Sequence, residues 1–338
     1  MLLAVAVVLA ACGGSSASPV ATQVTSTGST SAAPTAVVST PNPTATPPYA
    51  PVARTSAAIT WDPTSQAVVL FGGDSRFGAT SEFDAWDGAT WSKLVEIGPP
   101  SRDDGLLVAD PERGVVVLAG GRNQQIVQDD TWEWDGTTWS EKDVVGPPPR
   151  AHAAAAYDHE SKRMIVYGGV TETETMRDTW AWDGTAWTKL DDKGIPGLIP
   201  NGMAWDPILE RLLVLAVDLE AESSDHTYPS ELWGWTGDGW ERVAKDGPSF
   251  SPLQQFVEGP RHPWLIDGGV AQGAFSTLEW TGTAWQPLDG PAPPLRNGQA
   301  VAFDQVRHQM VLFGGFVDDT VLGDSWLLDD GAWREVGA

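Results

Sequence analysis

Residues 130–139 read DTWEWDGTTW, and residues 178–187 read DTWAWDGTAW. The two stretches begin 48 residues apart and differ at two positions. A search for such repeats precedes any assignment of helices or strands, because a period of about 20–50 residues determines the whole architecture. This repeated segment therefore decides the fold of the chain.

Two further marks extend the repeat along the sequence. Pairs of glycines recur, the first three of them 48 residues apart, at Gly72 and Gly73, Gly120 and Gly121, Gly168 and Gly169, Gly268 and Gly269, and Gly314 and Gly315. A tryptophan follows the turn of each copy, at Trp91, Trp139, Trp187, Trp240, Trp285 and Trp333. These marks predict six copies, of which the fourth has lost its double glycine.

Each copy contains four short runs that are typical of β-strands. A small, apolar run leads into an Asp-rich turn, and a β-branched run such as VVVLAGG at 115–121 follows it. A tryptophan-rich run, a turn and a last short run complete the copy. No helical period is present, so the sequence predicts an all-β protein.

The turn between the last two runs allows two hairpins. A two-residue turn at Asp135 and Gly136 would place Trp132 opposite Trp139, whereas a four-residue loop would place Trp134 there. Residues two apart in a strand share a face, so Trp139 meets an indole in either case. A buried tryptophan removes roughly 150–250 Å² from water. We therefore predict that these rings form the core between neighbouring copies rather than a platform for sugars.

The order of these features resembles the kelch repeat: a β-branched strand ending in Gly-Gly, an aromatic strand, then a tryptophan after a turn. The resemblance covers residues 54–338 and implies a six-bladed β-propeller with one four-stranded sheet in each blade. The family's arginine before the first strand matches Arg54, Arg102, Arg150 and Arg296. The WD repeat is the alternative, but here Trp-Asp precedes a glycine turn and no regular Gly-His accompanies it.

The N-terminus begins MLLAVAVVLAAC. The apolar run at 2–11 is too short to span a bilayer and has the length of a signal-peptide core. Residues 9–12, LAAC, resemble the bacterial lipobox, which implies that 1–12 is a lipoprotein signal and that Cys12 carries the lipid. No Lys or Arg precedes the run, and an ordinary cleaved signal is the alternative. The resemblance places the protein outside the cytoplasm, lipid-anchored to the bacterial cell membrane.

The charge of the chain is confined to its larger part. Residues 13–53 are rich in Ser, Thr, Pro and Ala and carry no charged residue, so we expect a disordered tether. The remainder holds all 45 acidic and 20 basic residues, for a net charge of −25. This acidity argues against nucleic acid and anionic lipid headgroups as partners. Cys12 is the single cysteine, so no intrachain disulfide is expected. We expect a monomer.

The predicted topology opens the loop before the first strand and the loop after the second on the same face. We predict a binding face there, formed by four arginines and the long acidic loop of the fourth copy: Arg54, Arg102, Arg150, Arg296, Asp218, Glu220, Glu222, Asp225 and His226.

These residues admit alternatives. The arginines could attract a carboxylate or sulfate. We favour instead their pairing with acidic residues that begin the third strands, namely Asp130, Asp178, Asp324 or Glu82. The acidic loop could hold a divalent cation, but it matches no calcium-loop spacing, so we predict no metal and no cofactor. We expect His152 to be structural, and three further histidines to be surface residues near turns: His159, His262 and His308.

Two functions fit the sequence. Kelch propellers resemble galactose oxidase, whose copper site needs a Tyr joined to a Cys, and the position of Cys12 in the signal excludes that chemistry here. The first hypothesis is a scaffold that binds an envelope protein or a glycan. The alternative is an extracytoplasmic carbohydrate-active enzyme that uses Glu222, Asp225 and Arg150 at the channel mouth. We assign no catalytic residue and favour binding. The ring would close by packing of the first blade on the sixth, or by a strand from before Arg54.

Overall fold

Every element of secondary structure in the described residues is a β-strand. The computed structural model describes residues 49–95, 97–124, 126–218, 228–248, 254–268 and 273–337. The predicted signal with Cys12, and the predicted linker up to residue 48, lie outside these ranges. No helix in this part of the chain is long and apolar enough to cross a membrane.

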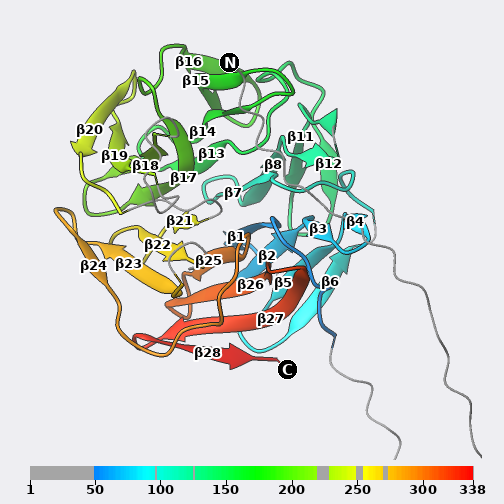
Figure 1. Cartoon of the computed structure of the whole chain (residues 1–338). Coiled ribbons are helices and arrows are strands. Elements are labelled where there is room, and N and C mark those ends of the chain that lie inside the picture. Colours follow the sequence, from blue (N-terminus) through cyan, green and yellow to red (C-terminus); the bar gives the residue numbers. More distant parts are fainter. Residues whose placement is uncertain are drawn as a thin grey trace, which may run out of the picture. The chain divides into compact units, whose positions relative to one another are not determined.

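Six four-stranded antiparallel sheets follow one another along the chain (Figure 1). The first is β1 (Ala58–Asp62), β2 (Ala67–Phe71), β5 (Phe83–Trp86) and β6 (Trp91–Val95). The second is β7 (Leu106–Asp110), β8 (Val115–Ala119), β11 (Thr131–Trp134) and β12 (Trp139–Glu141). The third is β13 (Ala154–Asp158), β14 (Arg163–Val170), β15 (Thr175–Trp182) and β16 (Trp187–Asp191).

The other three sheets repeat this order. The fourth is β17 (Ile199–Asp206), β18 (Arg211–Val217), β19 (Ser230–Trp235) and β20 (Trp240–Ala244). The fifth is β21 (Gln255–Val257), β22 (Trp264–Asp267), β23 (Ser276–Trp280) and β24 (Trp285–Pro287). The sixth is β25 (Ala300–Asp304), β26 (Gln309–Val317), β27 (Thr320–Asp329) and β28 (Ala332–Val336). Two small hairpins, β3 (Asp74–Ser75) with β4 (Gly78–Ala79) and β9 (Arg122–Asn123) with β10 (Ile126–Val127), project from the first two sheets.

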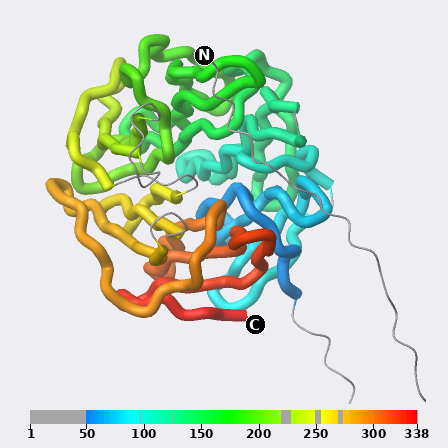
Figure 2. The backbone as a smooth tube through the Cα atoms, viewed as in Figure 1, coloured from blue at the N-terminus to red at the C-terminus, as the bar shows by residue number. Residues whose placement is uncertain are grey.

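The six sheets are the blades of a propeller. Their first strands contact one another in a closed ring, in the order β1, β7, β13, β17, β21, β25 and back to β1. Figure 2 shows the chain passing once around this ring, so that its blue beginning meets its red end. The predicted all-β, six-bladed propeller is confirmed.

The β-branched runs form the second strand of each blade. Every residue of β2 is buried, and four of the five residues of β8 are buried. A second strand lies within its own sheet and between two neighbouring blades, so both of its faces are covered. This position explains a continuous apolar run in place of the alternation that a half-exposed strand shows.

The tryptophan hairpin has the four-residue loop. Trp134 lies opposite Trp139, and the loop between them is closed by Asp135. Its carboxylate accepts the backbone N–H groups of Thr137 and Thr138, both at 2.8 Å. An Asp side chain that caps its own turn in this way stabilises the loop locally, which explains why the Asp-Gly sequence does not form the two-residue turn.

The tryptophans after these turns pack between blades, as predicted. The ring of Trp139 in the second blade lies 4.9 Å from that of Phe83 and 5.7 Å from that of Phe71 in the first blade. The indole N–H also reaches the preceding blade in four cases, where it donates to a hydroxyl: Trp91 to Ser325, Trp187 to Thr131, Trp240 to Thr179 and Trp333 to Thr277.

The remaining two post-turn tryptophans lack this bond. The indole nitrogens of Trp139 and Trp285 are buried and find no acceptor among the described residues. The position that carries Ser or Thr in the other blades is occupied by Phe83 before Trp139 and by Leu232 before Trp285. These two interfaces therefore depend on apolar packing without the hydrogen bond.

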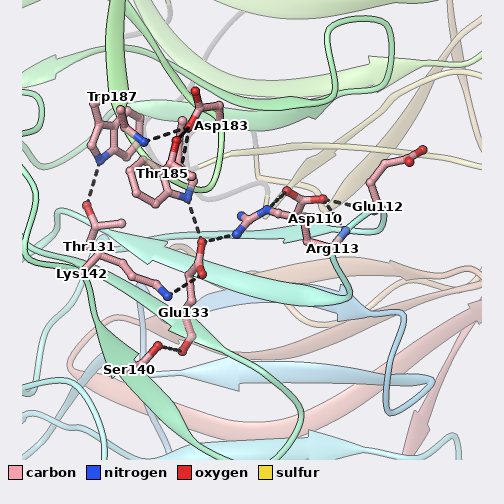
Figure 3. A network of polar contacts seen from close by, with 12 residues as sticks. Asp110, Glu112, Arg113, Thr131, Glu133, Ser140, Lys142, Asp183, Thr185 and Trp187 are labelled. Carbon is pink, nitrogen blue, oxygen red and sulfur yellow. Dashed lines mark hydrogen bonds and ion pairs between the residues drawn. The ribbon is translucent and has the colours of Figure 1, made fainter.

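A separate polar network joins the second and third blades. Glu133 on β11 is 5% exposed, and its carboxylate accepts the indole N–H of Trp182 in the next blade at 2.9 Å. Arg113 and Lys142 pair with the same carboxylate at 2.6 and 2.9 Å (Figure 3). Burial alone would raise the pKa of Glu133, but the bonds from Lys142, Arg113 and Trp182 hold it below its usual value.

The double glycines are explained by how closely the blades approach. Gly120 has φ +61°, and a Cβ atom there would lie 2.7 Å from the carbonyl oxygen of Arg150 in the next blade. The N–H of Gly121 donates to that same oxygen at 2.9 Å. Glycine is therefore needed both for the left-handed conformation and for the space that the neighbouring backbone occupies.

The ring closes by packing and by hydrogen bonds between the first and sixth blades. One apolar cluster contains Trp61 and Trp91 from the first blade and Phe313 from the sixth. The N–H of Gly315 donates to the carbonyl oxygen of Arg54 at 3.0 Å. Each of these two blades takes its four strands from one continuous segment of the chain, so the first of the two closure mechanisms considered above is the one observed.

The propeller also includes the last residues of the predicted linker. The Tyr49 hydroxyl donates to the carboxylate of Asp84 in the first blade, and Pro51 is buried. The contacts thus begin at residue 49, five residues before the predicted boundary at Arg54.

Candidate functional site

The two ends of the ring are chemically distinct surfaces. We call one the arginine face: it carries the segments before the first strands, with the four arginines, and the connections after the second and fourth strands. We call the other the turn face: it carries the turns between the first and second strands and the Asp-Gly hairpin loops.

The four arginines are buried and already occupied. Arg54, Arg102, Arg150 and Arg296 are 0–3% exposed. In the last three, one guanidinium nitrogen donates to the backbone carbonyl of the first glycine in the blade's Gly-Gly pair. The same guanidinium also binds the Asp at the start of the third strand: Asp130, Asp178 and Asp324. The predicted pairing is therefore observed, and no guanidinium is presented to a ligand. Arg150, the arginine of the enzyme hypothesis, is among them.

The first blade departs from this pattern. Arg54 binds Asp84, while Glu82, which aligns with the other three Asp residues, lies farther away at 3.4 Å. Asp84 occupies the strand position that Trp132 fills in the second blade. Burial raises the pKa of Asp84 even though Arg54 and Tyr49 both stabilise its charged form.

The three standard pairs lower the pKa of their carboxyl groups. Burial alone would raise the pKa of Asp130, but two hydrogen bonds and the charge of Arg102 hold it below its usual value. The same balance, with Arg150 and Arg296, lowers the pKa of Asp178 and Asp324. These groups therefore stay ionised and structural near neutral pH.

Most of the predicted acidic loop lies outside the described residues. This applies to Glu220, Glu222, Asp225 and His226, and also to Gly269. Asp218 is described, and its backbone N–H donates to the carbonyl of Pro229 at 3.1 Å. The loop as a binding element stays a prediction.

The arginine face carries apolar side chains that the sequence analysis did not single out. Among the residues that the structure describes, four large hydrophobic side chains are more than three-fifths exposed: Phe77 (80%), Ile97 (89%), Ile126 (66%) and Val145 (93%). Phe77 lies at the tip of the β3–β4 hairpin and Ile126 in β10. All four belong to connections of the first two blades on this face. These exposed apolar groups are candidate contacts for a partner.

Two neighbouring acidic residues, Asp103 and Asp104, also lie on the arginine face, in the segment before β7. Asp103 and Asp104 both pair with Arg122, at 3.4 and 3.1 Å, and His152 of the next blade lies 3.4 Å from Asp104. Burial and the charges of Asp104 and Asp74 raise the pKa of Asp103 to about 6, against the lowering effect of Arg122. His152 joins two blades here, which agrees with the structural role expected of it. Nowhere in the described part of the chain do three or more Asp, Glu, His or Cys side chains form a group that could hold a metal ion.

A channel of about 310 Å³ runs along the axis of the ring, lined by the first strands of all six blades. Many of its lining side chains are small and apolar, among them Ala58, Val108, Ala154, Ala204 and Ala302. Toward the turn face, aromatic side chains from four blades join the lining: Trp61, Tyr157, Trp205 and Phe303.

Glu258 is the one acidic side chain among the described residues that line this channel, and no Lys or Arg lines it. The other five blades have an Asp at the same position, and each of those caps its turn by accepting backbone N–H groups: Asp62, Asp110, Asp158, Asp206 and Asp304. Glu258 makes no such bond. Burial raises its pKa to about 7.

His159 is exposed, as expected of a surface residue, but neither His159 nor His262 is isolated as the sequence analysis predicted. His262 packs against the fourth blade, where its Nδ1 lies 2.8 Å from the carboxylate of Asp206. His159 lines the channel between the rings of Tyr157 and Trp205, at 5.0 and 5.2 Å, and burial lowers its pKa. Neither contact could be inferred from the sequence, because each joins turns whose proximity depends on the ring. His308 is exposed, as expected.

Glu258 is the residue that sequence reasoning missed most clearly. The available signal was the replacement of the turn Asp by Glu in the fifth copy, where the turn reads EGPRHP at 258–263. Comparison with known proteins adds no site residues, since no family model and no curated protein matches the chain.

Proposed function

We propose that this protein is a binding propeller of the kelch type that holds a partner protein on its arginine face. The observation that carries the proposal is the exposure of four large apolar side chains on connections of the first two blades: Phe77, Ile97, Ile126 and Val145. Exposed Phe and Ile side chains provide the apolar anchors around which protein interfaces form. They suit a protein surface better than a glycan.

The rest of the architecture is consistent with a scaffold. The repeated residues are used in the structure itself: the double glycines admit the neighbouring backbone, the arginines pair with Asp residues of their own blades, and the tryptophans fill the interfaces between blades. The connections that vary between blades are left to make contacts, as loops on a rigid framework commonly do.

The proposal includes a membrane anchor. The sequence LAAC at residues 9–12 supports lipid attachment at Cys12 in a bacterial envelope, and residues 13–48 would tether the propeller outside the cytoplasm. The variant Cys12→Ser should release the protein from the membrane fraction into the soluble fraction. Continued sedimentation with membranes would contradict the lipid anchor.

Affinity capture from envelope extract tests the binding role. The bait is the soluble chain from residue 49 onward, and the test variant carries Phe77→Ser and Ile126→Ser. A matched control carries Ile208→Ser and Val306→Ser, which replace residues of the turn face that are 57% and 51% exposed. We expect a protein that the unmodified bait and the control retain and the test variant loses. A partner held equally by all three baits would contradict the assignment of the face.

A further inference from the structure

The channel presents one carboxyl group, that of Glu258, which has no partner among the described residues. The described residues offer Glu258 no hydrogen bond and no ion pair, and its neighbours in the wall are Val257, Phe256 and the side chains of the facing strands. The carboxylates at the same position in the other blades are directed to their turns instead. Glu258 is partly exposed within the channel, so its carboxyl group is open to the charged group of a ligand.

The mouth of the channel favours a positive charge. Trp61, Tyr157 and Trp205 line it, and the faces of indole and phenol rings attract cations. His159 contacts the rings of Tyr157 and Trp205, so Trp61 is the aromatic ring that we assign to the cation. His159 is the one titratable base among the described lining residues, and burial lowers its pKa, which favours its neutral form. The net charge of −25 attracts cations toward the protein. The alanine and valine wall suits an apolar body behind the charged group.

We propose that the turn-face end of the channel binds a small organic cation, such as a primary or quaternary ammonium compound, with its charged group on Glu258. The volume of about 310 Å³ admits a molecule of this size. A bare metal ion is disfavoured because Ca²⁺ and Mg²⁺ take several oxygen ligands, whereas one carboxylate lines this site. The site is distinct from the apolar surface of the proposed function, because it lies at the opposite end of the ring.

Choline and its neutral analogue 3,3-dimethylbutan-1-ol are suitable probes, since they have nearly the same shape and differ in charge. Binding of each to the full chain is measured by isothermal titration calorimetry at pH 8.5, where Glu258 is ionised. The test variant is Glu258→Gln, which keeps the size of the side chain. Glu141→Gln is the matched control, because Glu141 is exposed on β12 and outside the channel.

We expect choline to bind the unmodified protein and Glu141→Gln with the same affinity, and Glu258→Gln at least tenfold more weakly. The neutral analogue should bind all three at least tenfold more weakly than choline binds the unmodified protein. No choline binding at 50 mM, or equal affinity for Glu258→Gln, would overturn the proposal. If Glu258→Gln does not fold, the unmodified protein provides a second test. We then expect nuclear Overhauser effects between the choline methyl protons and the channel tryptophans. Their absence at saturating choline would also overturn it.

Discussion

Replacing Gly120 by Ala tests the reason for the double glycines. The added methyl group would lie 2.7 Å from the carbonyl oxygen of Arg150, which is closer than a Cβ atom approaches an oxygen in real structures. The oxygen belongs to the backbone of the next blade and already accepts the N–H of Gly121. It cannot withdraw without moving that blade and weakening the bond.

The expected loss has two parts. A residue with a Cβ atom at φ +61° costs about 1–2 kcal/mol relative to glycine. Weakening the inter-blade hydrogen bond adds roughly 1 kcal/mol, and separating the packed blades adds to that. We therefore expect Gly120→Ala to lower the free energy of unfolding by about 2–4 kcal/mol.

Gly197 provides a control for the conformational cost of a Cβ atom at positive φ, without a clash with a neighbouring blade. It has φ +75°, and a Cβ atom there would meet no atom within 4 Å. Gly197→Ala should cost only about 1–2 kcal/mol. Both variants are measured by denaturant unfolding followed through tryptophan fluorescence. Equal losses in the two variants would refute the argument that the glycine admits the neighbouring blade.

Three further predictions concern the interior. Trp139→Ala should lower the free energy of unfolding by about 3–5 kcal/mol, because its ring fills the interface with Phe83; a loss below about 1 kcal/mol in denaturant unfolding would show that the interface does not depend on it. Thr131→Val should cost about 1–3 kcal/mol by leaving the buried N–H of Trp187 without an acceptor, and an unchanged unfolding midpoint would contradict this. The raised pKa of Glu258, about 7, means that the folded state binds a proton more tightly than the unfolded state. Stability from this group is therefore lost as the pH rises from about 4.3 to 7. Glu258→Gln should remove that part of the pH dependence in thermal unfolding between pH 5 and 8, and an unaltered slope would count against it.

The architecture could be predicted from the sequence because its determinants repeat. A double glycine, an arginine and a post-turn tryptophan recur in register, and each serves the same contact in successive blades. The pairing of Arg102 with Asp130 followed from the same regularity. The prediction became less accurate where one blade departs from the pattern, as in the pairing of Arg54 with Asp84.

The candidate sites were harder to predict for a physical reason. Exposure of Phe77 and Ile126 depends on hairpins that leave the sheet, and an apolar residue in a sequence does not reveal whether it is covered. The position of Glu258 in the channel depends on the ring as a whole. Its only local signal is one additional methylene group at a position where the other copies have Asp.

Site-specific photocrosslinking in cells tests the central claim, binding through the arginine face, most directly. A photoreactive phenylalanine analogue is placed at position 77 in one protein and at position 208 in another, so that it lies on the arginine face or on the turn face. We predict one crosslinked partner from position 77 and none from position 208. A partner crosslinked from position 208 and absent from position 77 would contradict the proposed binding face.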